Sequence, residues 1–264
     1  MNNDLNHQHA VIKYQHGAFQ STTDAIVEEA PLTIYINQEE FATLLCSPTY
    51  LKELMIGFLA SEGIIIAKKE VESMHIDDHK GAAYVTLVNK KVNMMQTTKR
   101  VFGSCCGKSR QFYFQNDMKT AKTAMSTLRI TPDQCIALME TLQQQSEIFQ
   151  KTGGVHNAAL ATPDHILLQR SDIGRHNALD KLYGHALIQQ QSLANQVLVF
   201  SGRISSEILL KAAKMRISIL LSKSAPTTLA IELAKDLNMT IVGFIREQSF
   251  NVYSHPERII KRSN

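Results

Sequence analysis

The stretch QVLVFSGRISSEILLKAAKMRISILLSKSAPTTLAIELAKDLNMTIVGFIR, residues 196–246, decides the fold of this chain. Short apolar segments rich in Val, Ile and Leu alternate within it with longer segments whose apolar residues recur at helical spacing. Such alternation is typical of a parallel or mostly parallel sheet that is covered by helices. We assign strands to residues 196–200, 217–221 and 240–244, and helices to residues 204–215 and 227–238.

The same alternation continues on both sides of this stretch. Thr131-Pro132-Asp133 is a favourable helix start, because Thr is a good N-cap and Pro suits the first turn, so we expect a helix from there to about Phe149. A strand at 165–170, a helix at 176–190 and an edge strand at 250–254 complete the pattern.

Two domains are therefore predicted. Residues 131–264 should form an α/β domain with a mostly parallel sheet and flanking helices, and residues 116–130 a connector. Residues 1–115 should form a smaller α+β domain that ends in a cysteine-containing loop. Its predicted elements are strands at 31–37 and 40–46 joined by a turn at Gln38-Glu39, a helix between Pro48 and Gly63, strands at 71–77 and 82–88, and a disordered start around His7 and His9.

The composition is that of an ordinary soluble globular protein. Of the 264 residues 44% are hydrophobic and 20% are charged, and the formal net charge is +4, too small to indicate nucleic acid by itself. No apolar run approaches the roughly 20 residues that a membrane span needs, and the N-terminus lacks the apolar core of a signal peptide. The four cysteines form no disulfide framework, so we expect a cytoplasmic protein.

Polar and basic residues follow three of the predicted strands. Ser201 and Arg203 follow the strand at 196–200, Ser222 and Lys223 follow the next, and Arg246 follows the third. In an open α/β sheet, ligands bind outside the carboxyl ends of the strands. Serine and threonine could simply cap helices there, but capping does not explain three cations at three strand ends. We predict an anion site for a nucleotide or pyrophosphate, although neither a P-loop nor a G-x-G-x-x-G sequence is present.

Two adjacent cysteines, Cys105 and Cys106, lie in the stretch GSCCGKSR, residues 103–110. Flanking glycines favour a loop over a core, and Lys108 and Arg110 supply positive charge that favours the thiolate. Most free cysteines are buried small hydrophobic residues, but this setting favours a reactive thiol. A metal site is not predicted, because no second cysteine pair follows at ligand spacing.

Two further clusters combine glycine with polar side chains. In GGVHNAA, residues 153–159, His156 could carry a proton, bind a ligand or be a satisfied core residue. In SDIGRHN, residues 171–177, Asp172 could accept hydrogen bonds from a guanine-like edge, while Arg175 and His176 could meet phosphate. The alternative for the second cluster is a capped helix start with exposed charges.

Several long motifs of this chain resemble the formate dehydrogenase accessory sulfurtransferase family (FdhD). Together they extend from the cysteine loop nearly to the C-terminus, and they occur in the order of the family. The motifs are SCCGK at 104–108, GGVHNAAL at 153–160, DIGRHNALDKLYG at 172–184, FSGRISSEILLKAA at 200–213, LSKSAPTTLAIELA at 221–234 and GFIREQSFNVYSHPERI at 243–259.

This resemblance implies a specific function. Members of the family take sulfur from a cysteine desulfurase as a persulfide and pass it to the bis-(molybdopterin guanine dinucleotide) molybdenum cofactor, which formate dehydrogenase requires. The second domain of the family is similar to a cytidine deaminase. The family's cofactor-binding segment corresponds here to Phe244, Ile245, Arg246, Glu247, Gln248 and Ser249.

The chain departs from the family at the cysteines, because many members carry two residues between them. Ser104 favours Cys105 as the persulfide carrier, whereas Gly107-Lys108 favours Cys106. We choose Cys105, with Cys106 as the alternative, and expect a carrier thiol and not a redox pair, because adjacent cysteines could bond only in a strained ring. The nearly two-fold symmetry of the cofactor suggests a homodimer that binds one guanine nucleotide in each subunit.

Two rival functions remain at this stage. A non-enzymatic chaperone that binds the cofactor for formate dehydrogenase would use the same crevice. A zinc-dependent nucleotide deaminase is disfavoured, because Ala158 stands where such enzymes need Glu, and the cysteines precede the histidine.

Overall fold

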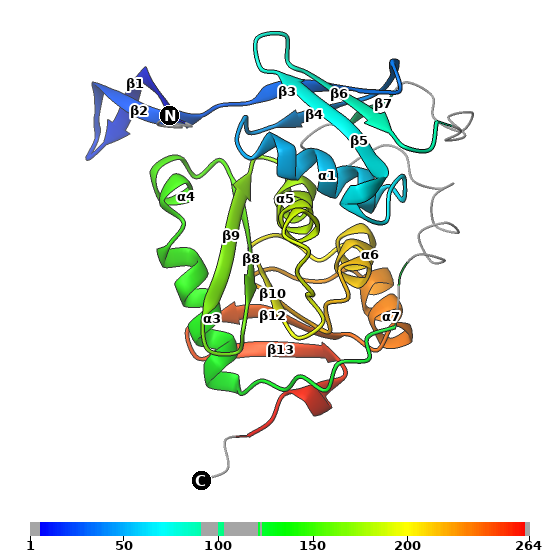
Figure 1. Cartoon of the computed structure of the whole chain (residues 1–264). Coiled ribbons are helices and arrows are strands. Elements are labelled where there is room, and N and C mark those ends of the chain that lie inside the picture. The colour runs from blue at the N-terminus through cyan, green and yellow to red at the C-terminus, as the bar shows by residue number, and fades with distance from the viewer. Residues whose placement is uncertain (1–5, 91–99, 103–120, 122, 262–264) are drawn as a thin grey trace.

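The computed structural model describes residues 6–90, 100–102, 121 and 123–261. Figure 1 shows two stacked units and a thin ribbon that leaves them at the N-terminus. The first unit is a five-stranded sheet in the order β5-β6-β3-β4-β7 with helix α1, and the second is a six-stranded sheet in the order β13-β12-β11-β10-β8-β9 with its helices. The ribbon is a separate two-stranded sheet of β1 and β2.

The first unit confirms the predicted hairpin, helix and strand pair. Strands β3 (Ala30–Ile36) and β4 (Glu39–Cys46) are antiparallel, and their turn lies at Asn37 and Gln38, one residue earlier than expected. Both turn residues have positive φ, 49° and 74°, as a tight two-residue hairpin requires. The other elements are α1 (Leu51–Ser61), a 3-10 turn (Lys68–Glu70), β5 (Val71–Asp77), β6 (Ala82–Leu87) and β7 (Arg100–Phe102).

The N-terminus corrects one prediction. His7 and His9, expected in a disordered terminus, lie in β1 (Asn6–Gln15), which pairs along its whole length with β2 (Ala18–Val27). The turn between them uses His16 and Gly17, both at positive φ. Polar residues dilute the alternation in both strands, and the prediction therefore missed them.

The second unit is built around three parallel strands, as residues 196–246 predict. Strands β10 (Val197–Phe200), β11 (Ile219–Ser222) and β12 (Thr240–Arg246) are parallel neighbours. Helices α6 (Ser206–Lys214) and α7 (Thr228–Asp236) connect them and cover one face, and α3 (Pro132–Gln144) covers the other. The remaining elements are α4 (Glu147–Thr152), β8 (His156–Ala161), β9 (Ile166–Asp172), α5 (Arg175–Ile188), β13 (Ser249–Ser254) and a 3-10 turn (Pro256–Arg258).

A mostly parallel sheet was too strong a prediction, because the sheet is mixed. Strand β8 is antiparallel to both β10 and β9, and β13 is antiparallel to β12. The β8–β9 and β12–β13 connections are short turns, which can return the chain only in the opposite direction. Strand β8 itself was not predicted, since its sequence HNAALA is rich in Ala, a poor strand former.

The helix expected from Thr131 to about Phe149 is divided into two. Helix α3 begins with a capping box of Thr131 and Gln134, as its sequence predicts, and ends at Gln144. Ser146 then donates its hydroxyl hydrogen bond to the carbonyl of Leu142, and α4 starts at the next residue. The predicted limits of the connector stay a prediction, since residues 103–120 and 122 lie outside the described parts. The likeness to cytidine deaminases also stays a prediction.

The two units are joined through α1 and α5, which cross at Gly57 and Gly184. A Cβ atom on Gly57 would lie 1.8 Å from the carbonyl oxygen of Asp180, and one on Gly184 would lie 1.8 Å from that of Glu53. The backbones are therefore so close that no side chain fits at either position. Among the residues described, no helix is both long and apolar enough to cross a membrane.

Candidate functional site

The carboxyl ends of the parallel strands meet at one edge of the second unit, and their loops are tied together. The backbone N–H of Lys223 donates to Phe200 O (3.1 Å), and the Ser224 hydroxyl donates to Ser201 O (3.2 Å). The backbone N–H of Phe244 donates to Ser224 O (3.3 Å). The structure thus brings together the three predicted strand ends, which we call the carboxyl edge (residues 200–203, 222–226 and 243–246).

The predicted serines fasten these loops. The Ser201 hydroxyl accepts from the Asn157 N–H (2.9 Å), which attaches the loop after β10 to the start of β8. Ser222 is fully buried, donates to Gly202 O (2.8 Å) and accepts from the Ser224 N–H (3.0 Å). Ser222 is thus closed to a ligand, and the capping-like role that sequence analysis considered describes it better than anion binding.

The three predicted cations differ in exposure. Arg203 and Arg246 are exposed at the carboxyl edge. Lys223 is half-buried, and its ammonium group donates to the Gln143 side chain of α3 (2.6 Å). The two guanidinium groups are therefore the better placed for a phosphate, because Arg offers a planar fork of donors.

Phe244 has the most unusual backbone at this edge. Its φ is 55°, a region in which a bulky aromatic residue is an outlier, and its side chain is 39% exposed. The preceding Gly243 has no room for a side chain, since a Cβ there would lie 2.9 Å from Ser224 O. The Arg246 guanidinium carbon lies 5.9 Å from the centre of the Phe244 ring, while Ile245 between them is buried. An aromatic ring and a cation are thus presented together to solvent.

In the rest of the predicted FIREQS segment, Glu247 and Gln248 form the turn between β12 and β13 and Ser249 begins β13. All three residues line a groove against α3. The groove has a volume of about 830 Å³. Its carboxylates make it acidic, which suits the N–H edge of a base better than a phosphate. The lining residues are Pro132, Asp133, Ile136, Ala137, Glu140, Glu247, Gln248, Ser249 and Phe250.

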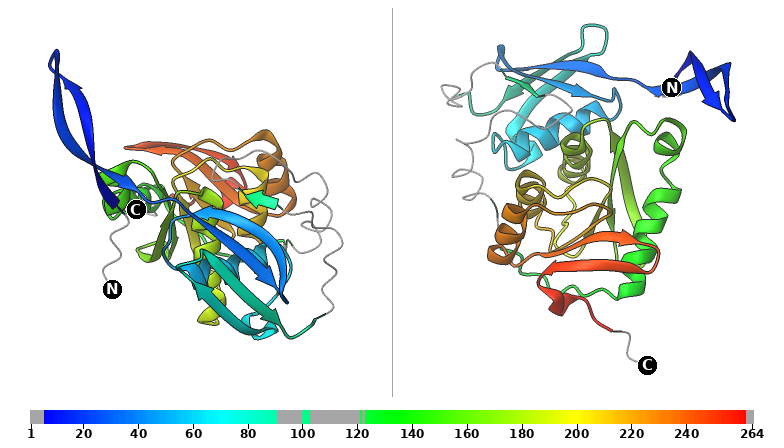
Figure 2. Two further views of the ribbon diagram at one scale, coloured as in Figure 1. Left: turned by 90° about the horizontal axis from the view of Figure 1, so that it is seen from above. Right: turned by 180° about the vertical axis from the view of Figure 1, so that it is seen from behind.

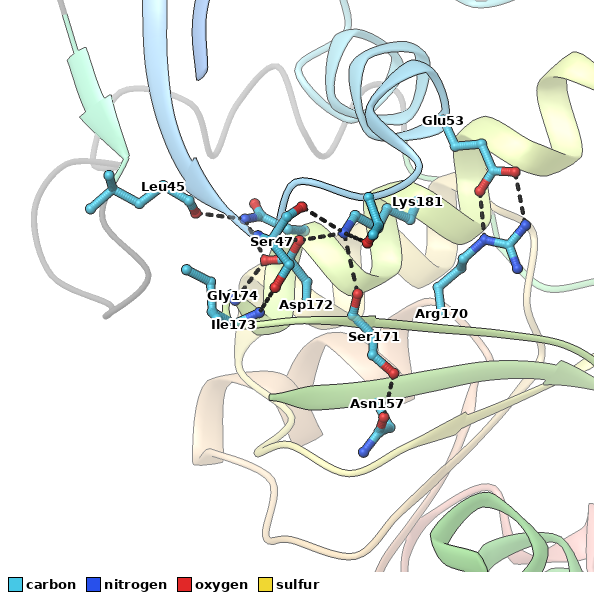
Figure 3. Close-up of polar contacts among 12 residues, drawn as sticks. Leu45, Ser47, Glu53, Asn157, Arg170, Ser171, Asp172, Ile173, Gly174 and Lys181 are labelled. Carbon is cyan, nitrogen blue, oxygen red and sulfur yellow. Dashed lines mark hydrogen bonds and ion pairs between the residues drawn. The ribbon is translucent and has the colours of Figure 1, made fainter. Parts of the chain in front are cut away.

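Asp172 does not face a ligand, contrary to the sequence-based suggestion that it reads a guanine edge. It is fully buried, and its carboxylate lies 2.6 Å from the Lys181 ammonium. It also accepts from the N–H groups of Gly174 (2.8 Å) and Ser47 (3.2 Å) and from the Asn177 amide (2.9 Å). Figure 3 shows this cluster at the junction of the two units. Asp172 therefore holds the units together.

Arg175 and His176 were suggested as phosphate ligands, and both are placed otherwise. Arg175 is only 8% exposed. His176 Nε2 lies 3.0 Å from the Glu207 carboxylate of α6, and burial lowers the pKa of His176. His156, by contrast, stands at the start of β8, opposite Asp172 in the pairing with β9 and near Gly202. Burial lowers the pKa of His156, although the Asp172 charge opposes this shift, so its imidazole is neutral near pH 7.

Cys105 and Cys106 lie outside the described residues. The other two cysteines, Cys46 and Cys135, are buried, and burial raises the pKa of each thiol to about 12. A thiol with such a pKa carries almost no thiolate at neutral pH, so both are poor nucleophiles. Among the residues described, no cluster of three or more His, Cys, Asp or Glu side chains could hold a metal ion.

Strand β7 ends one residue before the cysteine-containing stretch and pairs in parallel with β4, so that Phe102 lies opposite Leu44. Ser47 follows Leu44 by three residues in the chain. Its backbone N–H donates to the Asp172 carboxylate, and its hydroxyl accepts a hydrogen bond from the Ile173 N–H (3.2 Å). Strand β7 thus runs beside β4 in the direction of the junction at Ser47.

The buried charges of this junction were not predicted from the sequence. Glu53 on α1 receives two hydrogen bonds from Arg170 (2.6 and 2.8 Å) and lies 2.9 Å from His185 Nδ1. On the other side of α5, Asp180 pairs with Lys211 and accepts from the Ser61 hydroxyl. The available signal was that α5 carries Asp180 and Lys181 between Leu179 and Leu182, and charges buried among apolar side chains must find partners.

Comparison with known proteins agrees with the resemblance that the motifs suggested. The sulfur carrier protein FdhD of Bacillus subtilis (strain 168) is 55% identical over 260 residues, covering 98% of this chain and 99% of the relative. The protein of the same name from Staphylococcus haemolyticus is 56% identical and covers 98% of each. A solved structure from Desulfotalea psychrophila, described as a formate dehydrogenase accessory protein, has the same fold (TM-score 0.79, 22% identity, 97% of this chain and 100% of that one). Because the model of the FdhD/NarQ family also matches residues 27–260, this chain belongs to the FdhD/NarQ family.

Proposed function

We propose that this chain is a sulfurtransferase that carries sulfur as a persulfide on Cys105, with Cys106 as the alternative carrier. The sulfur donor is a cysteine desulfurase, and the acceptor is the bis-(molybdopterin guanine dinucleotide) molybdenum cofactor destined for the catalytic subunit of formate dehydrogenase. The relatives are named sulfur carrier proteins, which supports sulfur transfer. The identity of the cofactor and of the enzyme that receives it is inferred from the resemblance of the motifs to the family. The reducing cytoplasm is the expected compartment.

The observation that carries this proposal is the state of the other two thiols. With Cys46 and Cys135 buried and the pKa of each raised to about 12, the nucleophile has to be Cys105 or Cys106. These two cysteines are followed by Lys108 and Arg110, whose positive charge stabilises a thiolate.

The transfer takes place in two steps. The Cys105 thiolate attacks the outer sulfur of the desulfurase persulfide, so that a new S–S bond forms and the desulfurase cysteine leaves as a thiolate. The outer sulfur, now on Cys105, is then delivered to the cofactor. Because this sulfur is formally neutral, it becomes a sulfide only when a thiol reductant supplies two electrons, and Cys105 is released as a thiolate.

The geometry of β7 supports delivery at the carboxyl edge. Phe102 is fixed opposite Leu44, and Cys105 is only three residues further. Three residues span at most about 10 Å. We infer that Cys105 delivers its sulfur near the end of β4, where Ser47 meets Asp172 and His156 stands on the strand paired with that of Asp172. His156, neutral near pH 7, is suited to accept the proton of an incoming thiol.

The carboxyl edge would hold the nucleotide part of the cofactor. Arg203 and Arg246 supply the charge for a pyrophosphate, Lys223 can add to it, and Phe244 offers a face on which a guanine can stack. Each charge-assisted hydrogen bond to phosphate contributes about 1.5–3 kcal/mol. Because the cofactor carries two guanine nucleotides, a homodimer with one nucleotide in each subunit fits its symmetry.

Mass spectrometry after incubation with a cysteine desulfurase and cysteine tests sulfur transfer. We expect a gain of about 32 Da on the peptide that contains Cys105 and Cys106, lost on reduction. The variants Cys105→Ala and Cys106→Ala identify the carrier, and Cys135→Ala is the matched control, which should accept sulfur normally. If the double variant of Cys105 and Cys106 still supports full sulfuration of the cofactor, the carrier role is rejected and a cofactor-binding chaperone is left.

A further inference from the structure

The ribbon of β1 and β2 projects from the body of the protein. Figure 2 shows it in two views reaching beyond the outline of both sheets. At its base, Val27 packs against Gly154, where a Cβ atom would lie 2.6 Å from the Val27 methyl carbon. Beyond the base almost every side chain is exposed.

The two faces of the ribbon differ in character. Side chains of a strand alternate between faces, and directly opposed residues share one. The pairs Tyr14–Phe19, Ile12–Ser21 and Ala10–Thr23 therefore lie on one face, which has no charged side chain among its described residues. Ile12, Tyr14 and Phe19 are 73%, 64% and 76% exposed. The other face carries the charges of Lys13 and Asp24.

A ribbon of this kind is not expected to persist alone in water. An isolated two-stranded hairpin is marginally stable at best, and independent stability needs a third strand or another element packed on its apolar face. An antiparallel sheet usually buries one face and solvates the other, and the alternation here has that form. The described residues of this chain supply nothing that covers the apolar face beyond the base.

We propose that the apolar face of the ribbon is covered by the same face of the ribbon of a second copy of this chain, stacked in the opposite direction. The ribbon would then be a contact surface of the homodimer proposed above, and this contact does not depend on sulfur transfer. The ribbon is large at its tip, with Ile12, Tyr14 and Phe19, and small near its base, with Ala10 and Ala25. Opposite stacking therefore places large side chains over small ones, as interdigitating layers require.

The base also offers the tip a second apolar contact. Helix α4 lies beside β2, and its Phe149 is 43% exposed. The chain thus carries both a projecting tip and a receiving surface beside the base. Two such surfaces on one chain are the arrangement that a two-fold contact uses, because each copy gives a tip and receives one.

Charge favours a second copy over other occupants. The strands of the ribbon carry one Lys and one Asp, so their formal charges cancel when His is neutral. Binding to an anionic membrane surface is typical of clusters of about four to eight basic residues. Binding to nucleic acid likewise requires a basic patch that neutralises several phosphates. A neutral apolar face best matches an identical one.

Light scattering on the full chain is the first test. We expect the unchanged protein to have twice the chain mass of 29.6 kDa. The double variant Tyr14→Asp/Phe19→Asp should shift to the single mass, because it places charge on the apolar face. The matched control Gln20→Asp/Thr22→Asp adds the same charge to the other face and should remain dimeric, with the same thermal unfolding. A monomeric unchanged protein, a dimeric tip variant or a monomeric control would overturn the proposal.

Cross-linking tests the direction of stacking independently. Phe19→Cys and Ala25→Cys are made separately in a chain whose Cys105 and Cys106 are replaced by Ser, and a short bismaleimide is added. Stacked sheets lie about 10 Å apart, whereas two tips in opposite stacking lie about 20 Å apart along the strands. We expect cross-linked dimers mainly when the two variants are mixed. Equal cross-linking of the Phe19→Cys variant alone, or none in the mixture, would contradict this arrangement, whatever the outcome of the sulfur-transfer assay.

Discussion

Gly57 of α1 and Gly184 of α5 face each other where the two helices cross, and the backbone of each helix leaves no room for a side chain at the glycine of the other. A Cβ on either glycine would come within 2.8 Å of the backbone nitrogen of the other. The crossing unites a helix of the first unit with a helix of the second. It brings Glu53, Asp180 and Lys181 into positions where each makes a hydrogen bond across the junction, Glu53 with Arg170, Asp180 with Ser61 and Lys181 with Ser47.

The variants Gly57→Ala and Gly184→Ala should both destabilise the protein. A new methyl group would collide with backbone that cannot move away cheaply, so we expect a loss of at least about 1–3 kcal/mol in the free energy of unfolding. Urea unfolding of both variants measures this loss. Lys52→Ala, an exposed change on the same helix, is the control and should be neutral within about 0.5 kcal/mol. Glycine variants as stable as the control would contradict the close crossing.

Removing both members of the buried pair of Asp172 and Lys181 should cost less stability than the two separate removals added together. Lys181→Met leaves a buried carboxylate without its cation, for which we expect a loss of about 3–5 kcal/mol. The double variant Asp172→Asn/Lys181→Met leaves no buried charge at the pair, so its loss should be smaller than the sum of the two single losses. Denaturant unfolding of all four proteins gives the coupling free energy. Additive losses would show that the two groups do not interact.

Glu53 should make stability depend on pH in the acid range. Burial alone would raise its pKa, but hydrogen bonds from Arg170 and His185 hold the pKa below the ordinary value of 4.5. The folded state therefore binds this proton less readily than the unfolded state, and the resulting stability is present above pH 4.5 and lost as the pH falls through the folded pKa. Glu53→Gln should be less stable than the unchanged protein by about 2 kcal/mol at pH 7.

The difference between these two proteins should shrink as the pH falls below 4.5. Urea midpoints measured between about pH 3 and 7 follow this change. Glu232→Gln, on the exposed side of α7, provides the matched control, and its free energy of unfolding at pH 7 should stay within about 0.5 kcal/mol of that of the unchanged protein. A difference that is constant over the whole range would argue against an ionised Glu53 at the junction.

Phe244→Trp should report guanine nucleotide binding at the carboxyl edge. The chain contains no Trp, so this variant has a single indole fluorophore. A purine stacked on the ring should quench its fluorescence on addition of GDP. Tyr84→Trp, at a side chain 41% exposed on the first unit, is a control of matched exposure and should not respond. Calorimetric binding of GDP without quenching would remove Phe244 from the base site while leaving the nucleotide site in place.

The strands and helices of residues 196–246 were predicted well, because each has a clear local pattern of apolar residues and its helices begin at good capping residues. Thr131, Ser205 and Thr227 all cap helices through their hydroxyl groups, as such residues do. Strand direction was less predictable. Whether β8 runs with or against β10 depends on how the β8–β9 hairpin packs on the rest of the sheet, and the segment HNAALA does not indicate this.

The candidate site shows the same division between local and long-range information. Arg203 and Arg246 were placed correctly at strand ends, because strand direction alone determines that position. The role of Asp172 was predicted wrongly, because its partners are not its neighbours in the sequence. Ser47 belongs to the other unit, and Lys181 lies further along helix α5. A polar residue beside a glycine indicates an important position but does not indicate whether its partner is a ligand or the protein itself.

The junction also determines how the chain can be divided. Lys181 donates to backbone and side-chain oxygens at Ser47 and Thr49, and the Asp180 carboxylate accepts from Ser61. If residues 121–261 were produced as a fragment, these groups would lose partners that only the other part provides. Neither this fragment nor the remaining N-terminal part should therefore fold stably when it is produced alone in a cell. Co-expression of both parts from split genes should restore a working protein.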